Sequence, residues 1–300
     1  MQVSRKTQVE LTVFTPTFNR AYCIHQLYES LLRQTEKNFM WLVVDDGSTD
    51  NTREMVIKWQ KEKKIDIRYI YQENQGMHGA HNTAYANIDT ELNVCIDSDD
   101  FMTDNAVELI LDKWNSIEHK SNISGIVGLD IDKKGNIQGK IPDNMMYSTW
   151  HDLNVVHKSR GDKKLVFRTN AIKKYPKYPF FENEIFVPLS TLYLMIDQDY
   201  KLACLHEALC VIEYMQDGST LNIFKQYKRN PRGFRYARQI ELTYIKVFNI
   251  QVKKVLHYIS STLFIKDYKF FKNNPKKVLT LICLPLGIFF HLYIQFKNRK

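Results

Sequence analysis

Four apolar segments in the first hundred residues alternate with stretches of helical periodicity. The segments are Val9–Thr15, Met40–Val44, Ile67–Tyr71 and Leu92–Ile96. Apolar residues recur every three or four positions between them, as Ile24, Leu27 and Leu31 do after the first segment. Repeated strand–helix alternation predicts an α/β fold, in which a parallel sheet carries helices on both faces.

Three of the four predicted strands end in polar loops, at Pro16–Arg20, Asp45–Asp50 and Asp97–Asp100. In parallel sheets the carboxyl ends of the strands lie on one edge, where such proteins bind ligands. We therefore expect the three loops to converge on one crevice. Pro16 is expected to end the first strand, because proline has no N–H for the ladder.

The third loop concentrates negative charge, since Asp97, Asp99 and Asp100 lie within four residues. Carboxylates this close repel one another unless a cation offsets their charge. Oxygen ligands suit a hard cation such as Mg2+ or Mn2+. A solvated turn that caps the next helix is the alternative, and the neighbouring loops favour the metal site.

A strand is expected at Ile123–Leu129 and a hairpin turn at Asp132–Asn136, after which the regular alternation stops. The elements expected beyond it are a strand (Lys164–Arg168), a helix reaching Met195 and two paired strands (Lys201–Leu205 and Ala208–Tyr214). A helix is also expected over much of Ile240–Phe271.

The basic residues are concentrated near the C-terminus. Residues 1–220 hold 25 Lys and Arg against 31 Asp and Glu, whereas residues 221–300 hold 17 against 2, so the net charges are −6 and +15. We expect two parts, a main domain over residues 1–220 and a basic, mostly helical region over residues 221–300. The second part should contact an anionic partner.

A nineteen-residue stretch without formal charge, Val278–Phe296, lies inside the basic region. As a helix it would measure about 28 Å, close to the thickness of a bilayer core. Pro285, Gly287 and His291 weaken a spanning interpretation, so we favour a segment on or in the inner leaflet, with Lys and Arg on anionic headgroups. A buried helix of a soluble enzyme and a single span are the alternatives. The apolar stretch fits a membrane better than nucleic acid, so no nucleic-acid partner is expected.

Cysteine usage and the N-terminus bear on location. The five cysteines are scattered and form no C-x-x-C pair, which favours a reducing compartment and argues against a zinc site. Residues 1–10 are polar and lack an apolar segment, which argues against a secretory signal.

Three motifs, Phe14–Arg20, Val43–Asp50 and Asp97–Asp100, resemble in order and spacing the signatures of the family 2 glycosyltransferases. The resemblance covers roughly residues 8–220. It implies a GT-A fold, a nucleotide-diphosphate-sugar donor and inversion at the anomeric carbon. Bacterial relatives of this type make cell-surface polysaccharide, often on a polyprenyl-diphosphate-linked acceptor. The implied location is the cytoplasmic face of the cell membrane.

The resemblance also implies site residues. Those implied in binding the donor, a UDP-sugar in the simplest case, are Pro16, Thr17, Phe18, Asn19, Asp45, Asp46, His78 and Asp97. Asp99, supported by Asp97, would hold a Mn2+ or Mg2+ ion that neutralises the leaving diphosphate. Asp100 would serve the helix start or the sugar.

The segment Asn74–Asn82 resembles the Asn-Gly-Gly-Lys-His-x-Ala-x-Asn variant of another family motif. Gln75 and Met77 depart from that variant, and Met77 cannot provide the phosphate contact that lysine would. His78 or His81 could substitute, but either could equally be a packed, non-catalytic histidine.

Inverting transfer needs a general base beside the acceptor hydroxyl. In Phe180–Pro188 the favoured base is Glu184, and Glu182 is the alternative. A helix-start carboxylate without a catalytic role also fits. Glu213–Tyr214 and Asp217–Thr220 resemble the family's closing segment. The alternative to an enzyme is a non-catalytic nucleotide-sugar-binding or scaffolding protein.

Overall fold

The computed structural model describes residues 9–159, 161–213, 223–267 and 271–298. These residues form two compact units. The sheet unit comprises described residues within 9–75, 80–176 and 199–213, and the helical unit those within 76–79, 177–198 and 223–298. The region 177–198 thus groups with the C-terminal helices, whereas a boundary at residue 220 was expected. The expected closing segment at Tyr214 and Asp217–Thr220 lies outside the described residues.

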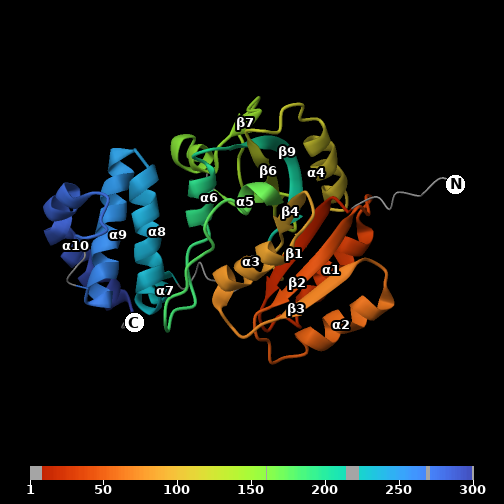
Figure 1. Cartoon of the computed structure of the whole chain (residues 1–300), viewed down its shortest axis with the longest axis horizontal. Coiled ribbons are helices and arrows are strands. Elements are labelled where there is room, and N and C mark those ends of the chain that lie inside the picture. The colour runs from red at the N-terminus through yellow and green to blue at the C-terminus, as the bar shows by residue number, and fades with distance from the viewer. Residues whose placement is uncertain (1–8, 160, 214–222, 268–270, 299–300) are drawn as a thin grey trace. The chain divides into compact units, whose positions relative to one another are not determined.

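The sheet unit is built on a mixed sheet (Figure 1). Its strands are β1 (Leu11–Thr17), β2 (Phe39–Asp45), β3 (Ile67–Tyr71), β4 (Leu92–Cys95), β5 (Phe101–Met102), β6 (Ile123–Ile131), β7 (Tyr147–Ser148), β8 (Lys163–Arg168) and β9 (Lys201–Val211). Their order is β3-β2-β1-β4-β8-β6-β9-β5, and β7 pairs with β9.

The first four strands form the parallel half of the sheet, as predicted. β1 pairs in parallel with β2 on one side and with β4 on the other, and β2 pairs in parallel with β3. The helices that accompany the sheet are α1 (Ile24–Arg33), α2 (Thr52–Glu62), α3 (Gly76–Asn87), α4 (Ala106–Asn115), α5 (Thr169–Ile172) and a π-helical turn (Asp152–Val156).

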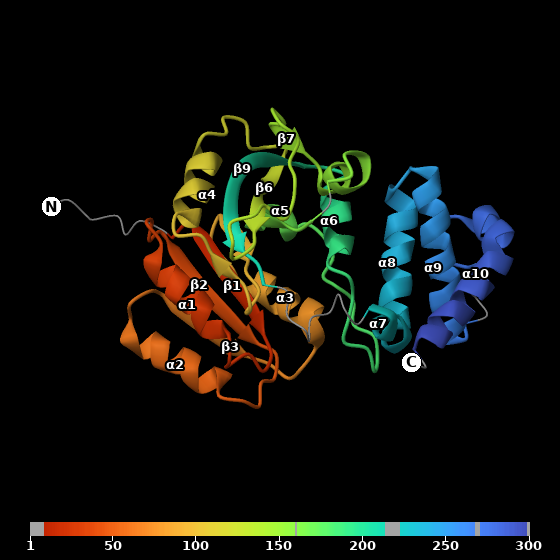
Figure 2. The same ribbon diagram turned by 180° about the vertical axis from the view of Figure 1, so that it is seen from behind.

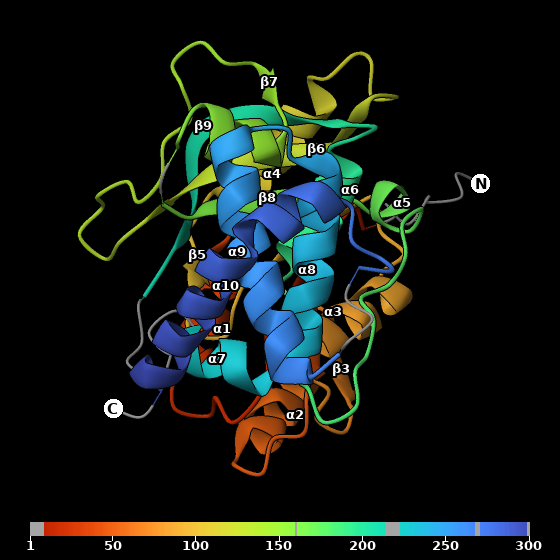
Figure 3. The same ribbon diagram turned by 90° about the vertical axis from the view of Figure 1, so that its left-hand side faces the viewer.

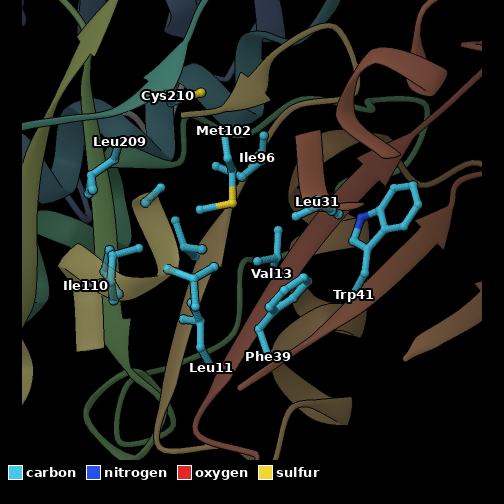
Figure 4. Close-up of a cluster of buried hydrophobic side chains, with 14 of the residues drawn as sticks. Leu11, Val13, Leu31, Phe39, Trp41, Ile96, Met102, Ile110, Leu209 and Cys210 are labelled. Atoms are coloured by element: carbon cyan, nitrogen blue, oxygen red, sulfur yellow. The ribbon is translucent and has the colours of Figure 1, made fainter. Parts of the chain in front are cut away.

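Alternating side chains of the parallel strands face two helical layers. Leu11 and Val13 of β1 and Trp41 of β2 join the larger buried cluster with α1, α2 and α4 (Figure 4). Phe14 and Leu42 point to the other face, where they pack on α3. This period-two alternation explains why the central strands are apolar throughout, because both of their faces are buried.

β1 continues through Pro16, which pairs in register with Val44 of β2, so the prediction that Pro16 ends the strand was wrong. Successive residues of a strand direct their N–H groups to opposite neighbours. The Thr17 carbonyl accepts a hydrogen bond from the β2 side, so the Pro16 nitrogen faces the β4 side. The β4 pairing has already ended at Phe14, and proline therefore breaks no ladder bond.

The other half of the sheet is mostly antiparallel (Figure 2). β8 runs antiparallel to β4 and to β6, and β9 runs parallel to β6. The two paired strands expected at Lys201–Leu205 and Ala208–Tyr214 are instead the single strand β9. Its register against β6 shifts near Val127 and Leu129, and such a bulge interrupts the apolar pattern in the middle of one strand.

The helical unit contains α6 (Ser190–Ile196), α7 (Ile223–Arg229), α8 (Pro231–Tyr244), α9 (Phe248–Ile265) and α10 (Lys277–Lys297). α9 lies between α8 and α10 (Figures 1 and 3). The helical stretch expected over Ile240–Phe271 is divided between α8 and α9, because Ile245 has an extended conformation with ψ of 123°. The apolar stretch Val278–Phe296 forms most of α10, as predicted.

Candidate active site

The carboxyl ends of β1, β2 and β4 lie on one edge of the sheet, because the three strands are adjacent and parallel. Hydrogen bonds join the first two loops directly. The Asn19 N–H donates to Ser48 Oγ (2.9 Å), and the Thr49 N–H donates to Asn19 Oδ1 (2.8 Å). Asn19 has a positive φ of 53°, a conformation that asparagine tolerates better than most residues. The predicted convergence of these two loops is confirmed.

The third loop begins at the same edge. Its first residue after β4, Ile96, donates its N–H to the Phe14 carbonyl of β1 (3.0 Å). From there the chain alternates in burial, so that Asp97 and Asp99 are partly exposed while Ser98 and Asp100 are buried. The exposed pair, two residues apart, is the part of the acidic stretch that can meet a ligand.

Asp100 turns inward, which resolves its role. Its Oδ1 accepts the Glu213 N–H (3.1 Å), and its Oδ2 lies 3.6 Å from the Lys164 ammonium. Burial raises the pKa of Asp100 to about 7, although the Lys164 charge partly opposes this rise. Asp100 therefore anchors the loop to β8 and to the segment after β9, and it does not face a ligand.

Lys164 is the residue that sequence reasoning missed. It lies on β8 and is buried, and Asp130 and Asp100 outweigh the effect of burial so that the pKa of its ammonium is raised well above its usual value. Burial also raises the pKa of Asp130 to about 6. The available signal was a lysine beside the apolar run Leu165–Phe167, since such a cation needs an acidic partner.

Asp45 and Asp46 hold the second loop together. Asp45 is fully buried, and its oxygens accept from the Ser48 N–H (2.8 Å) and the Tyr69 hydroxyl (2.6 Å). Burial, with the carboxylate of Asp45 alongside, raises the pKa of Tyr69. Asp46 Oδ1 accepts from Gln72 Nε2 (2.7 Å) and the Gln75 N–H (2.9 Å). The geometry gives Asp45 a turn-building role and makes Asp46 the support of the loop after β3.

Thr17, the last residue of β1, and Phe18, the first residue after it, differ in exposure. The Thr17 side chain is buried, and within the described ranges its Oγ1 has no hydrogen-bond partner. Phe18 is 44% exposed at the same edge. A buried hydroxyl without a protein partner costs free energy that a bound ligand can recover, and an exposed ring beside it offers a surface for a planar group.

The two histidines of the loop after β3 are packed. His78 belongs to the helical unit and lies 5.5 Å from Phe180 between ring centroids. His81 belongs to the sheet unit and meets Phe14 edge-on at 5.2 Å. Both side chains are about 1% exposed. This burial fits the packing interpretation, and the phosphate contact of His78 stays a prediction.

Glu184 caps a helix. Its two carboxylate oxygens accept the backbone N–H groups of Arg232 (3.0 Å) and Gly233 (2.9 Å), in the first turn of α8. A carboxylate at this position satisfies orphan donors and faces the positive end of the helix dipole. The helix-start role considered for Glu184 is therefore real, although the helix is α8 and not the one that follows.

Further contacts fasten the same segment to the start of α8. The Ile185 N–H donates to Asn230 Oδ1 (3.0 Å), and Arg232 Nη1 donates to the Glu182 carbonyl (3.1 Å). At Gly233 an added Cβ would meet the Phe186 carbonyl oxygen at 2.1 Å. We call residues 182–186 with residues 230–233 the α8 clamp. It fixes the backbone between Glu182, whose side chain is exposed, and Phe186.

A protein-family model described as "Glycosyl transferase family 2" matches residues 12–176, more than half of the chain. The chain belongs to glycosyl transferase family 2. The match includes all three loops at the edge of the parallel strands, so the resemblance of their motifs to this family is confirmed.

Curated relatives of this family 2 chain differ in how much they share with it. A 28% identity over 226 residues links it to an Escherichia coli protein named UDP-Glc:alpha-D-GlcNAc-diphosphoundecaprenol beta-1,3-glucosyltransferase WfgD, covering 73% of this chain and 83% of WfgD. Glycosyltransferase GlyA of Streptococcus pneumoniae is 34% identical over 115 residues, which are 38% of this chain. An uncharacterized Nostoc glycosyltransferase is 29% identical over 40% of this chain. The aligned parts span only 16% and 36% of those two relatives.

Solved structures confirm the GT-A-type fold. The S. aureus TarS fragment in complex with UDP-GlcNAc superposes with a TM-score of 0.60 at 18% identity, over 97% of this chain and 91% of that one. The mannosyltransferase PcManGT from Pyrobaculum calidifontis, in complex with GDP-Man and Mn2+, gives a TM-score of 0.50 at 17% identity, over 93% and 73%. At these identities the likeness concerns the fold.

Proposed function

We propose that this protein transfers a sugar from a nucleoside-diphosphate sugar to a glycan acceptor, with inversion, in the synthesis of a cell-surface polysaccharide. The observation that carries the proposal is the common edge of β1, β2 and β4, where Thr17, Asp46 and the Asp97–Asp99 pair end adjacent strands. A UDP-sugar is the favoured donor, because a fold relative binds UDP-GlcNAc and WfgD is named for UDP-Glc.

In this proposal the first two loops bind the nucleoside. Pro16, Thr17 and Phe18 line the base, with the Thr17 hydroxyl donating to or accepting from it. Asn19 and Asp45 shape the pocket through their loop hydrogen bonds. Asp46 is only 4% exposed and accepts from Gln72 and Gln75, and in this proposal its carboxylate also accepts a hydrogen bond from the base or ribose.

A divalent cation, Mn2+ or Mg2+, would be held by Asp99 with help from Asp97 and would neutralise charge on the leaving diphosphate. In the described part of the chain, no three His, Cys, Asp or Glu side chains are grouped to hold a metal ion. Two partly exposed carboxylates fit an ion that shares its coordination with substrate phosphates, as Mg2+ commonly does. Lys164 and Glu213 keep Asp100 out of that donor set.

The acceptor-side base is assigned to Glu184, with Glu182 as the alternative. The base takes the proton of the acceptor hydroxyl. The hydroxyl oxygen of the acceptor then bonds to the anomeric carbon, and the bond from that carbon to the diphosphate oxygen breaks. The clamp makes the two candidates different, because both Glu184 oxygens already accept helix N–H groups whereas the Glu182 side chain is exposed.

The proposed acceptor is lipid-linked, and the proposed location is the cytoplasmic face of the cell membrane, with residues 221–300 on its anionic surface. WfgD is named for a diphosphoundecaprenol acceptor, and another curated relative is named teichoic acid poly(glycerol phosphate) polymerase. Among the described residues, α10 is long and apolar enough to cross a bilayer by length and composition, and 28% of its most apolar 18 residues are buried.

A panel of nucleotide sugars with Mn2+ tests the proposal. Thermal shift should identify a bound donor, and release of nucleoside diphosphate should report its use. Asp99→Ala should abolish release. Full release by that variant would overturn the metal assignment. Donor binding without turnover under any condition, including added lipid-linked acceptor, would support the alternative of a non-catalytic nucleotide-sugar-binding or scaffolding protein.

A further inference from the structure

The outer face of α10 is apolar and exposed. Val278, Ile282 and Phe289 are 74%, 70% and 71% exposed. With Leu286, Leu292 and Phe296 they recur at intervals of three or four residues, which places them along one side of the helix. We call these six residues the outer stripe. Figure 3 shows α10 in front of α8 and α9, nearest to the viewer.

The inner face of α10 is more polar than the outer one. Its buried residues are Thr280, Cys283, Gly287, His291 and Ile294, and Cys283 joins an apolar cluster with α8 and α9. Thr280 Oγ1 accepts from Asn274 Nδ2 (2.8 Å), and His291 Nδ1 lies 3.2 Å from Ser260 Oγ. An added Cβ at Gly287 would meet the Ile259 side chain at 2.5 Å. An inner face with small and polar contacts beside some apolar ones, under an outer face that is apolar and exposed, is typical of helices in contact with lipid.

The charge around the stripe is positive. Lys276 and Lys277 precede the helix and Lys297 ends it, with its ammonium 5.7 Å from the ring centre of Tyr293. Residues 221–300 contain two acidic residues, and both are paired within the helical unit. Glu241 binds Arg238 and Lys254, and Asp267 binds Arg235. These pairs leave the lysines at the ends of α10 as its charged flanks.

A groove of about 580 Å3 opens where α9 and α10 begin. Phe248, Val278 and Ile282 contribute apolar walls, and Lys276 and Lys277 line the same groove. Lysine ammoniums beside exposed apolar side chains match the chemistry of a lipid phosphate joined to acyl chains.

We propose that the outer stripe and this groove form one docking surface for an anionic phospholipid bilayer, with α10 lying in the plane of the interface. The stripe enters the acyl region, and the flanking lysines contact headgroup phosphates. This inference rests on the proposed membrane location and specifies how it is achieved. α10 does not span, because α9 packs along it and would carry Lys253 and Lys254 into the hydrocarbon.

A second copy of the chain is the competing occupant. Two copies joined through this surface would bring lysine-flanked stripes together, with Glu241 and Asp267 already paired elsewhere. Like charges at such an interface oppose association. Anionic headgroups are complementary to the same lysines, so the charge pattern favours the bilayer.

Flotation of the full-length protein with vesicles tests the proposal. Binding should be at least 10-fold stronger to vesicles containing 30% phosphatidylglycerol than to pure phosphatidylcholine. Ile282→Glu/Phe289→Glu and, separately, Lys276→Glu/Lys277→Glu should each weaken binding at least 10-fold. The control Ile137→Glu/Met146→Glu changes two exposed apolar residues of the sheet unit and should bind as the wild type does. Unchanged binding by both test variants, or no vesicle binding by the wild type, would overturn the proposal.

Two further measurements separate the alternatives. Cysteines placed by Lys276→Cys and Lys297→Cys should both react with an impermeant thiol reagent outside the vesicles, whereas protection of one of them would indicate a span. A wild-type dimer in sedimentation that Phe289→Glu dissociates, without vesicle binding, would assign the surface to a second copy. Donor-dependent diphosphate release is assayed in parallel without vesicles. If the wild type binds vesicles but releases no diphosphate, the proposed function is wrong and this inference stands. If it releases diphosphate but does not bind vesicles, this inference is wrong and the proposed function stands.

Discussion

At the scale of single residues, Thr17 makes a prediction that separates binding from stability. Thr17→Val removes a buried hydroxyl that has no partner in the described chain, so the free energy of unfolding should not fall. If that hydroxyl contacts the donor, affinity for UDP should drop roughly 5-fold to 10-fold, the value of one hydrogen bond. Titration calorimetry with UDP and a denaturant melt measure the two effects.

Thr12 provides the matched control on the same strand. Its buried hydroxyl is 2.7 Å from that of Thr90, so Thr12→Val leaves Thr90 with one partner fewer. This variant should lose about 1 kcal/mol of stability and keep its UDP affinity. Equal UDP affinity in both variants would remove Thr17 from the donor pocket.

The two glutamates of the clamp can be told apart by their amide variants. Glu184→Gln should reduce transfer at least 100-fold while UDP still binds, because an amide cannot take the acceptor proton. It should also cost about 1 kcal/mol, since it weakens the cap on α8. Glu182→Gln, on the exposed neighbour, should retain most activity. The opposite result would make Glu182 the base and Glu184 only a helix cap. In that case Glu182→Gln loses transfer, whereas Glu184→Gln retains transfer and the acidic limb of its pH–rate profile.

At the scale of elements, Gly76 at the start of α3 and Gly135 in the turn after β6 form a matched pair of glycines. Gly76 has a φ of +78°, and an added Cβ would meet the Ile185 carbonyl oxygen at 1.8 Å. Gly135 has a φ of +82° with nothing within 4 Å. Alanine at either position meets the left-handed penalty of about 1–2 kcal/mol. Gly76→Ala should cost a further 1–3 kcal/mol or so, through overpacking. Equal melting temperatures for the two variants would contradict the close approach to Ile185.

The packing of α7, α9 and α10 around His257 predicts a pH dependence. The ring contacts Tyr227 and Phe290 at 5.0 and 4.7 Å, and burial lowers its pKa from 6.5 to about 3. Between those values the imidazole binds more protons in the unfolded chain than in the folded one, so the contribution of His257 to stability falls as the pH drops below 6.5. The raised pKa values of Asp100 and Asp130 act in the opposite direction, so the His257 effect is measured as a difference between the wild type and a variant. The difference in stability between the wild type and His257→Phe should change by about 1.4 kcal/mol per pH unit in this range. His119→Phe, at an exposed site, should show no such change. Parallel stability profiles of the wild type and His257→Phe would contradict this origin.

The elements show what sequence patterns can and cannot predict here. The parallel half of the sheet was predictable because doubly buried strands are apolar throughout and end in polar loops at one edge. β9 was divided in error because a bulge against β6 exposes His206 and Glu207 in its middle. The α8 clamp was beyond prediction, since Glu184 reaches helix N–H groups 48 and 49 positions away.

At the scale of the whole molecule, the position where the net charge changes differs from the boundaries of the two compact units. The net charge changes near residue 220, which suggested a boundary there. The described contacts group residues 177–198 with α7 to α10 instead. The segment that carries both candidate bases is thus part of the same compact unit as the basic helices. The basic C-terminal helices therefore also hold the backbone that carries both candidate bases.

Loss of the C-terminal helices should therefore stop transfer even to a soluble acceptor. A chain truncated after residue 222 lacks α8, so Glu184 and Ile185 lose the N–H and amide partners that hold them. Transfer should fall at least 100-fold, while a UDP-induced thermal shift persists if the sheet unit stays folded. The full-length variant Gly233→Ala tests the same contact without truncation, because its Cβ would displace the Phe186 carbonyl. It should lower transfer about 10-fold or more with UDP affinity unchanged. Wild-type transfer by Gly233→Ala would show that the clamp does not position the base, whatever the truncated chain does.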